Sequence, residues 1–204
     1  MKKIYQKIWD HARPHLNTRA NDIHTLSAIE FAYRLLDKEG GREAVVIPAV
    51  ILHDVGWKKV PEHLQLKAFG PNGSSKWNRV HEVEGVKTAK DILENVHYDP
   101  ALIPEILDII DGHDSRKHGI SLNDRIVKDA DKLTRYTKEI IHINMKRFNH
   151  SFEQFTGWLG ENLDQWMLTD AAREMARQEL ENRFKEAGND FPSPRMRGKA
   201  GGEK

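Results

Sequence analysis

The segment from Ala44 to Leu52 carries no polar side chain, and the doublet His53-Asp54 follows it directly. A helix that is apolar on every side is stable only when other elements surround it. Pro48 lies early in this segment, where a missing backbone N–H costs least. The sequence therefore predicts a helix over residues 43–54 in the middle of a bundle, with a histidine and an aspartate at its carboxyl end.

The remainder of the chain shows the same helical spacing of apolar residues, and the alternation typical of strands is scarce. Asn21 or Asp22 is expected to cap a second helix, which ends at Gly40-Gly41. A long polar loop is predicted over 56–78, where several Pro, Gly and Ser residues occur. The other expected helices cover residues 4–12, 80–96, about 100–112, 122–132, 136–148 and 152–185, the last as one helix or two. The predicted fold class is all-α, a compact helical bundle.

A chain of 204 residues is long enough for one domain with a substantial core. We expect a single all-α domain over residues 1–187, with its centre in roughly 20–150 and further helices over 151–187. From Gly188 onward the composition turns to Pro, Gly, Ser and charged residues, which predicts a disordered tail over 188–204.

Composition excludes several classes of site and partner. Cysteine is absent, so disulfides and thiolate ligands are ruled out, whereas eleven histidines remain available. A formal charge of +1 argues against a dedicated binder of duplex nucleic acid. No window approaches the length of apolar sequence that a membrane span needs, and the N-terminus lacks the apolar run of a signal peptide. We therefore expect a cytoplasmic protein that has neither a membrane nor duplex nucleic acid as a partner.

Five predicted helices each place a histidine or an aspartate on their apolar face, near one end. Imidazoles and carboxylates are costly to bury unless something pairs with them, and a divalent cation is the simplest common partner. Such a set suits one metal or two. His24, His53, Asp54 and Asp131 would hold the first, and His81 and His113 would hold the second, with Asp54 as a bridge. The candidate ligands are His24, His53, Asp54, His81, His113 and Asp131.

In their order along the chain, these residues resemble the ligand set of the HD-domain superfamily of metal-dependent phosphohydrolases. Residues 49–56 resemble the family's apolar helix that ends in the His-Asp doublet. Residues 128–133 resemble its downstream aspartate motif, and residues 81–85 resemble the histidine and glycine of the branch with additional histidines. The resemblance covers roughly residues 20–150. One departure is Trp57, which stands where many relatives have a lysine, while Lys58 follows one position later.

The resemblance implies hydrolysis of a phosphate ester or anhydride of a small metabolite by a metal-activated water, with a nucleotide favoured as substrate. Asp54 would bind metal and also orient or deprotonate the water, and Lys58 would assist catalysis. One or two divalent cations are implied. Manganese or iron is favoured, and magnesium, cobalt, nickel and zinc are also compatible with these ligands.

A phosphate substrate needs cations near the metal. Lys58, Arg116 and Arg135 are the candidates for substrate binding, because each lies close in sequence to a predicted ligand. Asp114 and Asp129 are either acceptors for a ligand histidine or surface charges, and the surface interpretation is favoured for Asp129. The aromatic residues that are expected to be exposed also favour a homodimer.

Other interpretations fit the same pattern. The ligand order also resembles that of HD-type diiron oxygenases, which iron content and a spectrum that changes with O₂ would reveal. A non-catalytic helical domain could instead bind a nucleotide or regulate a partner, with the metal serving structure only. In the simplest alternative the histidines never meet in space, and the chain is an ordinary helical bundle.

Overall fold

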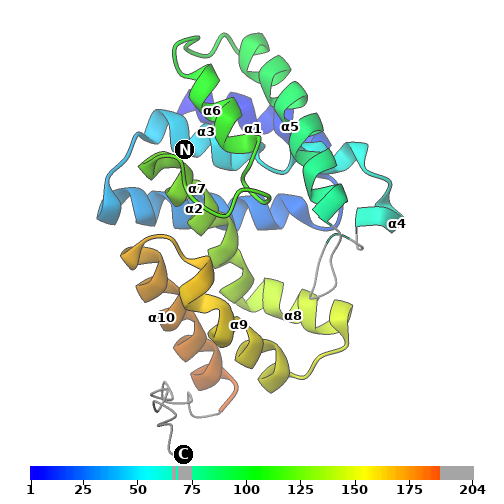
Figure 1. Cartoon of the computed structure of the whole chain (residues 1–204), viewed down its shortest axis with the longest axis vertical. Coiled ribbons are helices and arrows are strands. Elements are labelled where there is room, and N and C mark those ends of the chain that lie inside the picture. The colour runs from blue at the N-terminus through cyan, green and yellow to red at the C-terminus, as the bar shows by residue number, and fades with distance from the viewer. Residues whose placement is uncertain (66–67, 69–74, 189–204) are drawn as a thin grey trace, which may run out of the picture.

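The structure, a computed structural model, describes residues 1–65, 68 and 75–188. Throughout these residues the regular elements are α-helices and short 3-10 helices, without any strand, which confirms the all-α class (Figure 1). No helix in the described part of the chain is both long and apolar enough to cross a membrane. The predicted tail over 188–204 lies, from residue 189 onward, outside the described residues.

The elements keep the labels of Figure 1. In chain order they are α1 (Lys3–Leu16), α2 (Asn21–Glu39), α3 (Glu43–Leu52), η1 (Val55–Lys59), α4 (Glu62–Gln65), α5 (Ser75–Asn95), α6 (Ile103–Ile110), α7 (Leu122–Leu133), η3 (Thr134–Tyr136), α8 (Lys138–Phe148), α9 (Phe152–Trp166) and α10 (Asp170–Glu186).

Helix α3 lies in the middle of the bundle, as its apolar sequence predicts. Its residues from Val45 to Leu52 are all buried, and it packs against α1, α2, α6 and α7. Pro48 has no N–H for the carbonyl of Ala44, four residues earlier. The Tyr98 hydroxyl donates to that carbonyl instead, at 2.6 Å. The hydrogen bond that proline removes from the helix is thus replaced from another part of the chain.

The other helices surround this centre in two sets (Figure 1). Helices α5 and α6 lie at one end of the molecule, and α8, α9 and α10 lie at the other, beyond α2. Helix α7 links the centre to the end that contains α10, because it packs against α2 and α3 and also against α10. One hydrophobic core runs through both sets, from Tyr5 to Leu180.

Several predicted boundaries were wrong for identifiable reasons. Helix α1 continues past Pro14, because its buried face extends to Leu16. Asn21 and Asp22 do not cap α2, whose N-cap is Ala20 in a left-handed conformation. The predicted loop over 56–78 contains η1 and α4, and α5 begins before it ends. The 3-10 helix η3 separates α7 from α8, between the expected helices over 122–132 and 136–148, and residues 152–185 form two helices, one of the two expected possibilities.

Candidate metal centre

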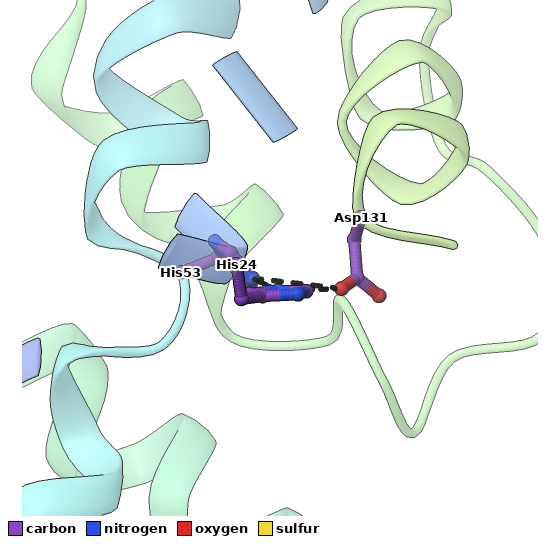
Figure 2. A group of neighbouring side chains, drawn as sticks. All are labelled: His24, His53 and Asp131. Atoms are coloured by element: carbon purple, nitrogen blue, oxygen red, sulfur yellow. Dashed lines mark hydrogen bonds and ion pairs between the residues drawn. The ribbon is translucent and has the colours of Figure 1, made fainter. Parts of the chain in front are cut away.

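The structure brings three of the predicted ligands together from distant parts of the chain (Figure 2). His24 comes from α2, His53 directly follows α3, and Asp131 comes from α7. The two imidazole Nε2 atoms are 3.1 Å apart, and Asp131 Oδ1 lies 3.1 Å from Nε2 of His24 and 3.6 Å from Nε2 of His53. These residues, called the first group below, offer nitrogen and oxygen atoms close enough to share one ion.

A second group lies beside the first and contains His81, His113 and Asp114. His81 is on α5, and the other two residues follow α6. The imidazole Nε2 atoms are again 3.1 Å apart, and Asp114 Oδ2 lies 3.6 Å from His81 Nε2 and 3.9 Å from His113 Nε2. The side chains of both histidines are almost fully buried. Asp114 was left open between two roles in the sequence, and the structure places it in this group.

Asp54 stands between the two groups, as its predicted bridging role requires. Its Oδ2 atom lies 3.7 Å from His24 Nε2 and 3.6 Å from His53 Nε2. Its Oδ1 atom lies 3.8 Å from His81 Nε2 and 3.6 Å from His113 Nε2. The Trp57 indole N–H donates to the same Oδ1 at 3.0 Å. One carboxylate therefore offers a different oxygen to each group.

The outer nitrogen of every histidine in the centre has an acceptor of its own. His53 Nδ1 donates to the Val50 carbonyl at 2.7 Å, and His113 Nδ1 donates to the Ile110 carbonyl at 2.9 Å. His81 Nδ1 faces the Trp77 carbonyl at 3.4 Å. Carbonyl oxygens only accept, so these contacts place the proton on Nδ1 and direct the Nε2 lone pair toward the centre.

The outer nitrogen of His24 is hydrogen-bonded to a hydroxyl instead of a carbonyl. Thr134 Oγ1 donates to the Asp131 carbonyl at 2.6 Å, so the oxygen accepts from His24 Nδ1 at 3.0 Å. Each imidazole can therefore present an unprotonated Nε2 to a cation. This donor set, with imidazole nitrogens and carboxylate oxygens, fits a divalent metal in each group.

Charges in the centre shift the pKa values of these residues strongly. Burial opposes ionisation of Asp54, but the His53 and His113 imidazoles hold the pKa of this carboxyl well below its usual range. Burial lowers the pKa of His53, yet Asp54 and Asp131 outweigh it and raise the pKa to about 10. Burial and the neighbouring His113 lower the pKa of His81 to about 4. Before a metal binds, therefore, His53 is protonated at neutral pH and His81 is not.

Glycine allows η1 to lie close enough to α5 to form this centre. A Cβ atom on Gly56 would lie 1.9 Å from the His81 carbonyl oxygen and 2.5 Å from the backbone nitrogen of Gly85. No side chain fits in that space. Gly56 and Gly85, the glycines of the two sequence motifs, are thus in contact, and this contact brings Asp54 beside His81.

Two buried charged residues, which were not among those predicted from the sequence, hold the turn that carries His113 and Asp114. Glu82 accepts from the backbone N–H of Asp114 at 3.0 Å and from Ser115 at 2.8 Å through N–H and 2.7 Å through the hydroxyl. Lys128 donates to the carbonyls of Gly112, His113 and Arg116. Both side chains are fully buried. The sequence could have indicated them only through their position beside predicted ligands, because Glu82 follows His81 and Lys128 lies three residues before Asp131.

The three predicted substrate-binding cations contact residues outside the two groups. Lys58 is exposed, and its amine donates to the Asn17 carbonyl at 3.4 Å. The Arg116 guanidinium donates to the Asp108 carbonyl at 2.8 Å and pairs with the Asp124 carboxylate at 3.7 Å. Arg135 lies over the Trp166 ring, 4.9 Å from its centre. Their roles in substrate binding, and that of Lys58 in catalysis, stay predictions.

Asp129 differs from its expected place on the surface. It is fully buried and accepts from the N–H groups of Leu168 and Thr169 at 2.7 and 2.9 Å and from the Thr169 hydroxyl at 2.8 Å. The surface interpretation was wrong, because this carboxylate connects α7 to the start of α10. Its donors lie about forty residues further along the chain, so no residue near Asp129 in sequence indicated that it would be buried.

Comparison with known proteins agrees with this geometry. A family model described as HD domain matches residues 21–136, a range that contains both groups and Asp54. Among solved structures, the chain is similar to a predicted HD superfamily hydrolase from an uncultured Thermotogales bacterium, with 19% identity and a TM-score of 0.59. That match covers 90% of this chain and 88% of the other, and it shows a shared fold. No curated protein matches.

Proposed function

Because this chain belongs to the HD-domain family of metal-dependent hydrolases, we propose that it is a phosphohydrolase that acts on a small phosphorylated metabolite, with a nucleotide as the favoured substrate. The observation that carries the proposal is the pair of groups that share Asp54. Each group aims two imidazole nitrogens and a carboxylate at one point, and one carboxylate spans both points. Such a centre suits a phosphoryl group, because its negatively charged oxygens can bind to two cations at once.

The ligand residues would divide as the distances indicate. His24, His53 and Asp131 would hold one cation, and His81, His113 and Asp114 would hold the other. When bound, two divalent cations supply Lewis acidity toward phosphoryl oxygens and a water that is acidic near neutral pH. We favour manganese or iron, because imidazole and carboxylate ligands suit both, and magnesium, cobalt, nickel and zinc are the ions to compare.

In this mechanism Asp54 would orient the attacking water and would not act as the base that deprotonates it. The surrounding imidazoles lower its pKa well below the usual range, so the carboxylate stays ionised and is a weak base. Its Oδ1 atom is additionally held by the Trp57 N–H. A rigid, ionised carboxylate between two cation sites can orient an attacking oxygen, and the dry protein surroundings strengthen its electrostatic effect.

The test is elemental analysis of purified protein together with hydrolysis assays on a panel of nucleotides and other phosphate esters, with each candidate metal added in turn. We expect bound divalent metal and metal-dependent release of phosphate or pyrophosphate. Asp54→Asn keeps the shape of the side chain but removes its charge, and it should abolish turnover while helicity measured by circular dichroism is preserved. Asp91→Asn, an exposed aspartate on α5, is the matched control and should behave as the wild type.

Two results would overturn the proposal in favour of the alternatives. Iron with a spectrum that changes on exposure to O₂, and no phosphate release, would indicate the oxygenase chemistry of related HD-type diiron enzymes. Metal whose removal lowers the melting temperature, again with no turnover on the panel, would indicate a domain in which the metal is structural.

A further inference from the structure

The side chain of Arg19 is joined to the metal centre through one aromatic ring. Its guanidinium carbon lies 4.6 Å from the centre of the Trp57 ring. That ring stacks on the His81 imidazole, with 3.9 Å between centroids and 11° between planes, and its N–H donates to Asp54 Oδ1. A single indole thus contacts a ligand of the second group, the bridging carboxylate and an arginine.

A buried amide holds the same arginine from another side. Arg19 Nε donates to Gln65 Oε1 at 2.5 Å. Gln65 is 2% exposed, and its own amide donates to the carbonyls of Trp57 and Val60 at 2.9 and 2.7 Å. Arg19 is therefore held by two partners: Trp57, which lies in η1, and Gln65, which is bonded to η1 and to the residue after it. Such fixing lowers the entropic cost of using a long side chain to bind a ligand.

The backbone at this point adopts a conformation that costs free energy. Arg19 and Ala20 have φ values of 51° and 62°, in the left-handed region that residues other than glycine adopt rarely. Such a conformation persists only where the surrounding structure imposes it, often at a ligand site. This pair directly precedes α2, whose first turn carries His24 toward the first group.

The charge of Arg19 suits the centre once cations are present. Burial lowers the pKa of Arg19 to about 10, against the attraction of the Asp54 and Asp114 carboxylates, so the guanidinium is charged at neutral pH. The carboxylates of the two groups and Asp54 contribute three negative charges. Two divalent cations would exceed that by one, and Arg19 would bring the net local charge to about +2, which complements a phosphate dianion.

We propose that Arg19, held by Trp57 and Gln65, binds the phosphoryl group of the substrate beside the metal centre. This rests on the proposed function. Arginine is suited to the task because its planar fork can donate two parallel hydrogen bonds to phosphate oxygens. It replaces Lys58 as the best-supported candidate, since Lys58 is exposed and its amine donates to the Asn17 carbonyl. Arg19 was missed in the sequence because its partner Gln65 lies 46 residues away.

The experiment measures binding of inorganic phosphate to the metal-loaded protein by calorimetry, with metal content and melting temperature recorded for every variant. Arg19→Ala should weaken phosphate binding about tenfold or more, the range for a hydrogen bond to a charged group, and should raise KM for a substrate more than it lowers kcat. Arg19→Lys keeps the charge but loses the planar guanidinium, so its affinity for phosphate should lie between those of the wild type and Arg19→Ala. Arg34→Ala is the matched control, because Arg34 also lies over an aromatic ring, that of Phe31 at 5.1 Å, and pairs with Glu179. It should bind phosphate as the wild type does.

Arg19→Ala protein that carries full metal and binds phosphate as tightly as the wild type would overturn this proposal and leave the proposed function intact. If Arg19→Ala does not fold, Arg19→Lys decides, and an unchanged affinity for phosphate would overturn the proposal. If metal-loaded wild-type protein neither binds phosphate nor hydrolyses any ester, the proposed function fails and the role of Arg19 fails with it.

Discussion

The first and second groups of the metal centre offer the same kinds of ligand atoms but are held in different ways. The first group sits on α2, on α7 and at the end of α3, and these three helices pack directly against one another. In the second group only His81 lies within a helix, whereas His113 and Asp114 lie in the turn after α6. That turn is positioned by hydrogen bonds from the buried side chains of Glu82 and Lys128.

This difference indicates which kinds of change each group can tolerate. The geometry of the first group follows from apolar packing, so it cannot be lost without disturbing the core. The geometry of the second group depends on a few polar contacts, so it can be loosened while the fold remains. Polar residues that orient metal ligands typically change metal affinity 10–100-fold when they are removed. The two groups should therefore respond separately to substitution.

The largest expected effect comes from removing one ligand of each group in turn. His53→Ala should empty the first group, and His81→Ala should empty the second, so each variant should bind one metal ion fewer than the wild type. Hydrolysis should fall by more than about 100-fold in both, because the effect of losing a ligand exceeds that of losing a residue behind it. Elemental analysis gives the metal per chain, and circular dichroism gives the helicity.

The exposed His11 on α1 supplies the control for these variants, since His11→Ala should keep full metal and activity. Loss of all metal from His81→Ala would break the comparison, because the first group would then depend on the second.

A smaller effect is expected from Glu82→Ala, which keeps every ligand but removes the acceptor for the turn. The N–H groups of Asp114 and Ser115 would lose their charged acceptor, and a hydrogen bond to a charged group contributes about 1.5–3 kcal/mol of stability. Metal affinity of the second group should fall about 10–100-fold, with the first group unchanged. Competition with a chelator measures both affinities.

Glu84→Ala on the same helix is the matched control, because Glu84 pairs with Lys87 at the surface. An equal loss of affinity in both groups after Glu82→Ala would show that the turn is not what distinguishes them.

The two groups also differed in how far the sequence could predict them. Rows of apolar residues at helical spacing placed His24, His53, His81, His113 and Asp131 on inward faces, whereas Asp114 of the second group was left open between two roles. The fold class followed from the same spacing, and the apolar segment before His53 identified the central helix. These predictions depend on periodicity within a helix, which sequence displays directly.

What the sequence could not predict lies in turns and in contacts over long distances. Glu82 and Arg19 act through partners 32 to 46 residues away, and no local pattern indicates such pairs. Lys58 and Arg116 were favoured because they lie close in sequence to predicted ligands. Their side chains point away from the two groups, to the carbonyls of Asn17 and Asp108. Long polar side chains are therefore the least predictable part of the centre.

The third prediction concerns protons, and its effect is the smallest. Asp54 and Asp131 raise the pKa of His53 to about 10 against the effect of burial, whereas burial and His113 lower the pKa of His81 to about 4. In metal-free protein at neutral pH, His53 should carry a proton on Nε2 and His81 should not. Metal binding at the first group must displace that proton, so its affinity should rise about tenfold per pH unit near neutrality. Calorimetry in buffers of different ionisation enthalpy counts the protons released.

Stability of the metal-free protein checks the same assignment independently. A folded pKa above the unfolded value of 6.5 means that the stabilisation from charged His53 is fully present below pH 6.5 and is lost as pH rises toward about 10. His81 has the opposite sign, because its depressed pKa makes stability fall as pH decreases from 6.5 toward about 4. In metal-free protein, His53→Ala should therefore flatten the alkaline decline in stability, whereas His81→Ala should leave it unchanged. If His81→Ala flattened the alkaline decline instead, the raised pKa would belong to the second group, and the electrostatic contrast between the groups would be reversed.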